Sequence, residues 1–182
     1  NLANELLEKN PEDKYLNRLL GAHYLKTKEY QKSSEYFDKV LLVNKYDSSI
    51  YNTYGLLFLY QGKYEEAMKK FEKAMQYSPK DDMTYKYAFE NIAEIHKAKG
   101  DNKIAIDLYY ELIEIDPTLS LSYSKLAILY DIEGKGVLSD NLLQIAHDNK
   151  FVGSYGQMGL ACYYSHKGDT KKALSYLEEA ID

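Results

Sequence analysis

The stretch from Tyr60 to Pro79, YQGKYEEAMKKFEKAMQYSP, decides the fold. Its apolar residues recur at helical spacing, and Ala67, Phe71 and Ala74 fall on one face of the predicted helix. Leucine would bury more apolar surface than alanine at two of these positions. We therefore expect other helices to approach this helix closely at Ala67 and Ala74, because a closely packed interior leaves no room for larger side chains there.

The same pattern occurs five times along the chain, and the five copies align without gaps. From Lys28 to Gly62 is 34 residues, as it is from Gly100 to Gly134 and from Gly134 to Gly168, whereas Gly62 to Gly100 is 38. The aligned positions hold small residues at Ser33, Ala67, Ala105, Ser139 and Ala173, and large ones at Phe37, Phe71, Tyr109, Leu143 and Leu177. A fixed period in this range indicates a solenoid of stacked supersecondary units.

Each unit is predicted to be two antiparallel helices joined by a short turn. In the second copy Tyr51, Tyr54 and Phe58 recur at helical spacing, and Gly62 then ends the first helix as a C-terminal glycine does. A second helix follows and ends before Pro79. Small residues allow the two helices of one unit to pack closely, and Ala74 makes room for the first helix of the next unit.

These residues resemble the tetratricopeptide repeat family, whose pattern is W-x₂-L-G-x₂-Y, then A-x₃-F, then P over 34 residues. The matching residues in the copy at 48–81 are Tyr51, Tyr54, Gly55, Phe58, Ala67, Phe71 and Pro79. The resemblance implies an all-α fold, a right-handed superhelical solenoid of antiparallel helix pairs that occupies residues 1–182 as one domain. The predicted repeats are 14–47, 48–81, 86–119, 120–153 and a partial copy at 154–182, preceded at 1–13 by the end of another second helix.

Two copies depart from the family pattern. In the copy at 86–119 the preceding DDMT, residues 81–84, is expected to lengthen the first helix at its N-terminal end. The copy at 120–153 is the weakest, and the helix after it begins GSYGQMG, with three glycines. Because glycine costs about 1 kcal/mol relative to alanine in a helix interior, we expect residues 134–159 to be the least stable part of the solenoid.

Composition and charge argue against two classes of function, nucleic-acid binding and membrane spanning. The net charge of −5 and a pI near 5.5 disfavour nucleic-acid binding, which needs a basic surface. No apolar run reaches the roughly 20 residues of a membrane-spanning helix. The chain begins with Asn1 and stops within a helical pattern, so we expect it to be part of a longer protein whose targeting signals lie elsewhere. The compartment stays open, with the cytoplasm favoured.

The residues that could support catalysis or bind a metal are scattered. The four histidines form no metal-binding motif, and Cys162 is the single cysteine. His166 lies one turn from Cys162, yet no third group is placed to orient it as a base. GSYGQMG matches no phosphate-binding loop, and close helix contact explains it better. The sequence thus predicts no enzyme, no metal and no cofactor.

The family resemblance implies that the first helices of successive repeats line a groove for a peptide or partner helix. The candidate groove residues are Tyr15, Arg18, Asn52, Leu56, Tyr60, Tyr87, Glu90, Glu94, Ile128, Asp131, Tyr155 and Met158. Tyrosine, leucine, isoleucine and methionine are frequent in this set, and exposed apolar stripes usually mark partner sites. The alternative is that these side chains cover one another or face a further repeat.

The groove lacks the Lys and Asn clamp with which related co-chaperones hold the acidic tail of heat-shock chaperones. The matching positions hold Arg18 with Ala22, Asn52 with Leu56, and Glu90 with Glu94 in the third helix. The two glutamates would repel a carboxylate, so binding of a chaperone tail is rejected.

The sequence therefore predicts a protein-interaction scaffold whose partner has apolar anchors and a basic residue near Glu90, Glu94 and Asp131. One alternative is a self-association module, including weak association end to end. Another is a regulatory region attached to an enzymatic domain outside these residues.

Overall fold

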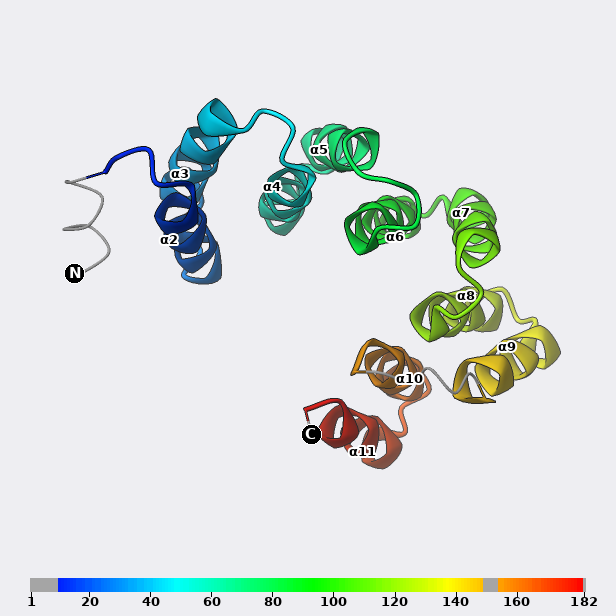
Figure 1. Cartoon of the computed structure of the whole chain (residues 1–182). Coiled ribbons are helices and arrows are strands. Elements are labelled where there is room, and N and C mark those ends of the chain that lie inside the picture. Colours follow the sequence, from blue (N-terminus) through cyan, green and yellow to red (C-terminus); the bar gives the residue numbers. More distant parts are fainter. Residues whose placement is uncertain (1–9, 149–153, 182) are drawn as a thin grey trace. The chain divides into compact units, whose positions relative to one another are not determined.

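The computed structural model describes residues 10–148 and 154–181, apart from the side chain of Tyr155, and these residues form ten helices and no strand (Figure 1). The helices are α2 (Lys14–Lys26), α3 (Tyr30–Val43), α4 (Ser48–Tyr60), α5 (Tyr64–Gln76), α6 (Met83–Ala98), α7 (Asn102–Ile115), α8 (Ser120–Ile132), α9 (Gly136–Asp148), α10 (Ser154–His166) and α11 (Thr170–Ile181). The predicted all-α class is confirmed. Within the described chain, no helix is both long and apolar enough to cross a membrane.

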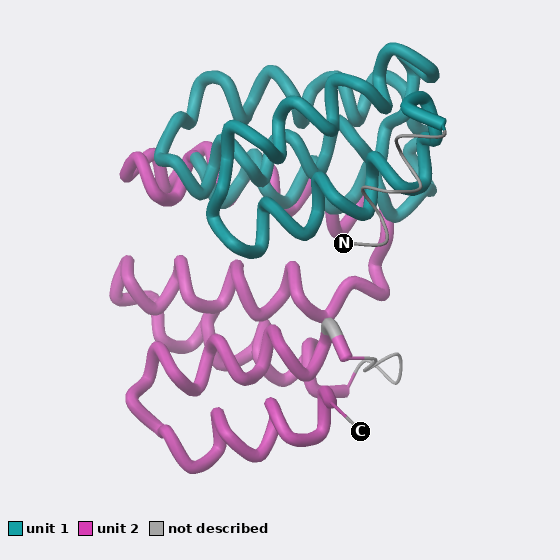
Figure 2. The backbone as a smooth tube through the Cα atoms, turned by 90° about the vertical axis from the view of Figure 1, so that its left-hand side faces the viewer, with its two compact units in different colours: residues 1–95 teal, residues 96–182 magenta. Residues whose placement is uncertain are grey.

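The chain divides into two compact units, Asn1–Ile95 and His96–Asp182 (Figure 2). Unit 1 contains the antiparallel pairs α2/α3 and α4/α5 and most of α6. Unit 2 contains α7 and the pairs α8/α9 and α10/α11. The assignment of the whole chain to one domain, with the repeat boundaries given above, stays a prediction.

The first helix of each pair ends in the same turn. Gly62, Gly100, Gly134 and Gly168 have φ between 71° and 83°, in the left-handed region that glycine enters without strain. The N–H of Gly62 donates to the carbonyl of Leu59 at 2.9 Å, and the N–H of Lys63 donates to that of Phe58 at 3.0 Å. This pair of bonds is a Schellman motif, as predicted for a C-terminal glycine.

Inside the two pairs of unit 1, a glycine of the first helix lies against an aromatic ring of the second. A Cβ atom added to Gly21 would stand 2.5 Å from Cε1 of Phe37, and one added to Gly55 would stand 2.4 Å from Cε1 of Phe71. Both rings are fully buried. The small residue of the first helix is therefore required by a ring that packs on its backbone.

Between pairs, the small residues of the second helix admit the next first helix. Ala67, Phe71 and Ala74 of α5 are fully buried in one cluster with Ala88 and Ile95 of α6. The close approach expected at the two alanines is confirmed. A matching cluster joins Phe37 and Val40 of α3 to Ile50, Tyr54 and Leu57 of α4.

The helix α6 has 16 residues, against 13 in the other first helices, and it begins at Met83. The lengthening predicted from DDMT is thus confirmed. The N–H of Thr84 donates to Oδ1 of Asp82 at 2.6 Å, which stabilises the first turn.

The glycine-rich start of α10 serves close packing in unit 2. A Cβ added to Gly159 would lie 3.0 Å from Cα of Leu121 and 3.0 Å from Oγ of Ser124, so α10 crosses the backbone of α8 at this point. The interpretation of GSYGQMG as a close helix contact is confirmed at Gly159. The lower stability expected for residues 134–159 stays a prediction. Residues 149–153 of that range lie outside the described residues. The helix end predicted at residues 1–13 also lies largely outside the described residues.

Candidate functional site

The candidate residues lie on the first helix of each pair. We call those on α2, α4 and α6 the first-helix face of unit 1. They are Tyr15, Arg18, Asn52, Leu56, Tyr60, Tyr87, Glu90 and Glu94. Those on α8 and α10, namely Ile128, Asp131 and Met158, make up the first-helix face of unit 2. Tyr155 lies in α10, but its side chain is outside the described residues.

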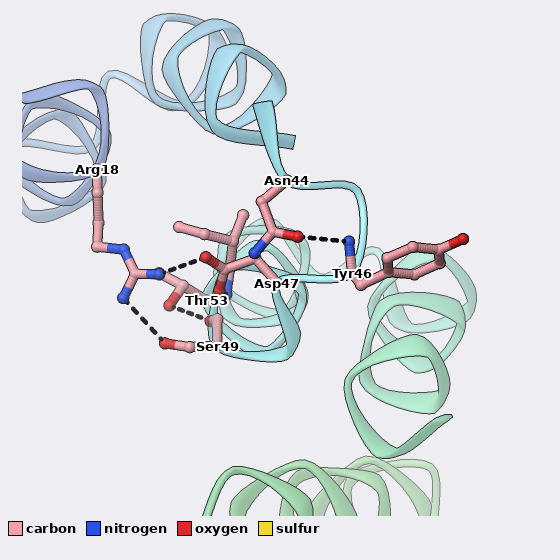
Figure 3. Close-up of polar contacts among 7 residues, drawn as sticks. Arg18, Asn44, Tyr46, Asp47, Ser49 and Thr53 are labelled. Atoms are coloured by element: carbon pink, nitrogen blue, oxygen red, sulfur yellow. Dashed lines mark hydrogen bonds and ion pairs between the residues drawn. The ribbon is translucent and has the colours of Figure 1, made fainter. Parts of the chain in front are cut away.

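Arg18 links α2 to the start of α4 (Figure 3). Its Nη2 atom donates to Oδ2 of Asp47 at 2.7 Å, and its Nη1 atom lies 3.5 Å from Oγ of Ser49. The other carboxylate oxygen of Asp47 accepts the N–H of Ile50 at 3.1 Å and caps α4. The guanidinium is thus oriented by a neighbouring helix, and Asp47 balances its charge. It can therefore donate hydrogen bonds to a ligand, but it does not act as an unpaired positive charge.

The turn before α4 holds this arrangement in place. The N–H of Tyr46 donates to Oδ1 of Asn44 at 3.2 Å, and the hydroxyl of Thr53 donates to the carbonyl of Ser49 at 2.9 Å (Figure 3). Asp47 itself is mostly buried, so its position is set by local backbone geometry as well as by Arg18. The ion pair is consequently part of the fold of unit 1.

The apolar candidates of unit 1 differ in exposure. Leu56 is half-buried and packs against the core cluster around Tyr51 and Phe71. Tyr15 and Tyr60 are 72% and 62% exposed. The two tyrosines therefore have most of their side-chain surface available for contact with a partner, whereas the side chain of Leu56 is only partly accessible.

Asn52 is half-buried beside these residues. Its Oδ1 atom is out of reach of solvent and accepts no hydrogen bond from the described residues. A buried polar atom without a partner costs roughly 1–3 kcal/mol, so such an atom calls for an explanation. In this conformation Oδ1 is closed to a ligand as it is to water, and the described residues give it no donor.

The acidic side of this face comes from α6. Glu90 and Glu94 are half-buried, as is Tyr87, and each of the three has an interaction partner within the chain. Glutamates one turn apart add their negative potentials on one face of the helix. The preference for a basic residue at that point stays a prediction, because both glutamates already interact within the chain.

In unit 2, Asp131 joins the C-terminal ends of α8 and α10. Its carboxylate accepts a hydrogen bond from Nζ of Lys167 at 2.8 Å and lies 3.0 Å from Nε2 of His166. The hydrogen bond from Lys167, with that of His166 and their charges, lowers the pKa of Asp131 below its ordinary value, although partial burial opposes the shift. Asp131 is therefore engaged within the unit and attracts a basic ligand less than the sequence suggested.

Ile128 is the candidate that the structure places elsewhere. It is buried in a cluster with Ala127 and Tyr163 and cannot offer its side chain to a ligand, so its selection as a surface contact was wrong. The i, i+4 pattern put it in line with Leu56, but the close approach of α10 covers it. Met158 is exposed as expected.

Sequence reasoning missed Asp47 and Lys167, the partners of Arg18 and Asp131. Asp47 stands at an N-cap position just before a helix, and that signal was present in the sequence. Nothing local indicated Lys167, because its contact with Asp131 joins residues 36 apart in the chain. His166 is likewise directed at Asp131. Among the described residues, no group of three or more His, Cys, Asp or Glu side chains is placed to hold a metal ion.

Comparison with known proteins agrees with this architecture. Models of the tetratricopeptide repeat match residues 48–81, 87–119 and 155–182. The protein ycf37 of Cyanophora paradoxa is 33% identical over 129 residues, which cover 69% of this chain and 72% of that protein. The photosystem I assembly protein Ycf3 of the same organism is 26% identical over 110 residues, covering 59% of this chain and 63% of its own length.

Solved structures share the fold at low sequence identity. YrrB, described as a tetratricopeptide repeat protein with an unusual peptide-binding site, superposes with a TM-score of 0.60 at 18% identity, covering 100% of this chain and 92% of its own. A tetratricopeptide repeat protein from Parabacteroides merdae gives a TM-score of 0.72 at 15% identity, covering 98% and 68%. With its repeated helix pairs, Schellman turns and matched residue ranges, this chain belongs to the tetratricopeptide repeat family.

Proposed function

We propose that this chain is a protein-interaction scaffold without catalytic activity, which binds a peptide or helical segment of a partner on its first-helix faces. The observation that supports it most directly is the exposure of the large side chains of Tyr15, Tyr60 and Met158 on first helices. Exposed aromatic and methionine side chains are typical anchors of protein interfaces.

The relatives support the same kind of function. Ycf3 is named a photosystem I assembly protein, and a protein of Schizosaccharomyces pombe that matches over 82% of this chain is a subunit of the anaphase-promoting complex. Both names describe proteins that work among other proteins. This chain covers only 63% and 22% of those two proteins, so their particular partners are not assigned to it.

The chemistry of unit 1 defines the preferred ligand. An extended peptide would place apolar side chains against Tyr15 and Tyr60 and a basic residue near Glu90 and Glu94. Arg18, held by Asp47, would donate to a backbone carbonyl of the peptide. We further infer that the repeats act as a single scaffold and associate weakly through their ends.

Selection from a random peptide library displayed on phage tests this function. We expect the selected peptides to share apolar residues and a lysine or arginine, and to bind about tenfold more weakly to the variants Tyr60→Ala and Tyr15→Ala. Leu42→Ala is the matched control, because Leu42 is an exposed apolar residue of the second helix α3.

The double variant Glu90→Lys with Glu94→Lys tests the charge preference separately. It should reject the basic peptides and accept versions in which the basic residue is replaced by glutamate. Peptides that bind all these variants as tightly as the parent chain would place the binding site away from the first-helix face of unit 1.

A further inference from the structure

The outer face of α9 has three exposed apolar side chains. Val137 is 78% exposed, Leu138 47% and Ile145 43%. At helical spacing they fall within one stripe, and the buried residues Ser139 and Ala146 lie on the opposite side of the helix. We call these three residues the α9 stripe.

The other repeats show what this position normally contains. Val137 aligns with Gln31, Glu65, Lys103 and Lys171; Leu138 aligns with Lys32, Glu66, Ile104 and Lys172; Ile145 aligns with Lys39, Lys73, Glu111 and Glu179. Of the five second helices that the structure describes, α9 alone is apolar at all three positions. Single exposed apolar residues are ordinary, but a stripe of them on one helix marks a surface that another molecule covers.

The charges beside the α9 stripe are acidic. Asp140 and Asp148 are exposed in α9, which contains no lysine or arginine. Asp148 accepts a hydrogen bond from Nε2 of Gln144 at 2.8 Å and lies 3.7 Å from Nδ1 of His147, and the charge of Lys167 acts on Asp140. The preceding Lys135 is already paired, since its Nζ atom lies 2.7 Å from Oε2 of Glu133 and 5.2 Å from the centroid of the Tyr130 ring. The stripe therefore presents apolar surface with a negative border.

We propose that the α9 stripe is a docking surface for a basic amphipathic helix of a partner protein. The apolar face of such a helix would cover Val137, Leu138 and Ile145, while its lysines and arginines would face Asp140 and Asp148. A second copy of this chain fits less well, because two α9 helices packed together would bring their aspartates near one another. The surface lies on a second helix and is separate from the first-helix faces.

The probe is a synthetic helical peptide with a stripe of leucines bordered by lysines, titrated into the chain and followed by amide chemical shifts. A second peptide has the same leucine stripe bordered by glutamates. We expect shifts to concentrate in Gly136–Asp148, and the lysine peptide to bind at least about tenfold more tightly than the glutamate peptide. Added salt should weaken the lysine peptide and leave the glutamate peptide nearly unaffected.

The variant V137Q/L138K/I145K places on α9 the residues that α3 has at the same positions. We expect it to weaken binding of the lysine peptide at least about tenfold while its thermal midpoint stays near that of the parent chain. Ile104→Lys is the matched control, because Ile104 occupies in α7 the position of Leu138 and is 46% exposed. It should bind like the parent, whereas Leu138→Lys alone should show part of the loss.

Five results would overturn the proposal, and four of them concern binding or association. These four are absence of saturable binding, equal binding by the triple variant, shifts concentrated outside α9, and a dimer of the parent chain that the triple variant abolishes. The last would assign the stripe to a second copy of the chain. A large drop in the thermal midpoint of Leu138→Lys would instead identify the stripe as part of the core. Because the lysine peptide could also bind the first-helix face of unit 1, the titration is repeated in the double variant Glu90→Lys with Glu94→Lys. Shifts in Gly136–Asp148 should persist there, so failure of the α9 proposal and failure of the proposed function give different results.

Discussion

Lys28 has the backbone conformation that glycine has in the other four repeats. Its φ is 63°, and the bonds from the N–H groups of Lys28 and Glu29 to the carbonyls of Leu25 and Tyr24 complete the same turn. A side chain in this conformation is strained, because its Cβ approaches the following carbonyl oxygen. The fold therefore imposes the turn even where the sequence does not favour it.

Lys28→Gly should consequently raise the free energy of unfolding by about 1 kcal/mol, since glycine enters the left-handed region without strain. Urea unfolding monitored by circular dichroism measures the change. The reverse substitution Gly62→Lys should lower the free energy of unfolding by a similar amount. A loss of stability in Lys28→Gly would mean that contacts of the lysine side chain outweigh the backbone strain.

Substitutions at Gly55 and Gly136 distinguish the effect of close packing from that of helix propensity. Gly55→Ala should destabilise the chain by roughly 1–3 kcal/mol, because the new methyl group would overlap the ring of Phe71. Gly136→Ala should stabilise it by up to about 1 kcal/mol, since nothing lies within 4 Å of the added atom. Thermal unfolding of both variants decides this, and effects of the same sign would contradict the packing described for α4 and α5.

The carboxyl of Asp131 titrates below the ordinary value of 3.8, mainly because of the hydrogen bond from Lys167. A pKa that is lower in the folded chain stabilises the fold above the ordinary value and loses that effect as the pH falls through the folded pKa. Lys167→Met should raise the pKa of Asp131 toward 3.8, as measured by the carboxyl carbon shift in an NMR titration. An unchanged midpoint in that variant would assign the shift to His166 instead.

At the scale of the element, an N-cap aspartate starts the first helices α2 and α4, whereas Leu119 before α8 gives no side-chain cap. Asp13 caps α2 through the N–H groups of Tyr15 and Leu16. Asp47 caps α4 and also holds Arg18, so one side chain both starts a helix and links it to the preceding pair. The second helices α3, α5 and α7 lack such a cap at Glu29, Lys63 and Asp101, but in α11 the N–H of Lys172 donates to Oδ1 of Asp169 at 3.1 Å.

Asp13→Ala should cost about 1 kcal/mol, the usual effect of losing an N-cap. Asp47→Ala should cost more, because it also leaves the guanidinium of Arg18 without its carboxylate. In the background of Arg18→Met, the two aspartate substitutions should become nearly equal, and a double-mutant cycle by urea unfolding measures the difference. Equal effects of the two substitutions in the parent chain would show that the ion pair adds nothing to the cap.

At the scale of the whole molecule, several apolar residues on α2 and α11 are uncovered. Leu19 is 62% exposed, although the aligned Gly159 lies against the preceding first helix. Ile181 is 85% exposed, although the aligned Leu41 packs against the clusters of unit 1. In a solenoid these positions face neighbouring repeats, so they are the surfaces through which copies would associate.

We expect weak association that grows with concentration and is reduced in the double variant Leu19→Lys with Ile181→Lys. Light scattering over a wide concentration range measures it. The α9 variant V137Q/L138K/I145K serves as the control and should associate like the parent chain. A strictly monomeric parent at high concentration would show that these residues attract no second copy.

The sequence by itself determined the helix pairs, their turns and their packing residues. Periodicity, positive-φ glycines and small residues are local signals, and each repeat provides them again, so an error at one copy is corrected by the others. Gly62, Ala67 and Phe71 could therefore be assigned their roles from the sequence, as could the lengthened start of α6. The exposure of Tyr60 and Met158 followed from the same register.

Only the tertiary structure decided which candidates remain available to a partner. The register that exposes Met158 also placed Ile128 on the surface, yet the crossing of α10 over α8 buries it. The pairing of Arg18 with Asp47, and of Asp131 with Lys167, depends on distances between helices about one repeat apart. A residue's place on its own helix follows from the helical repeat, but burial and charge pairing depend on the neighbouring helix, whose approach is set by packing.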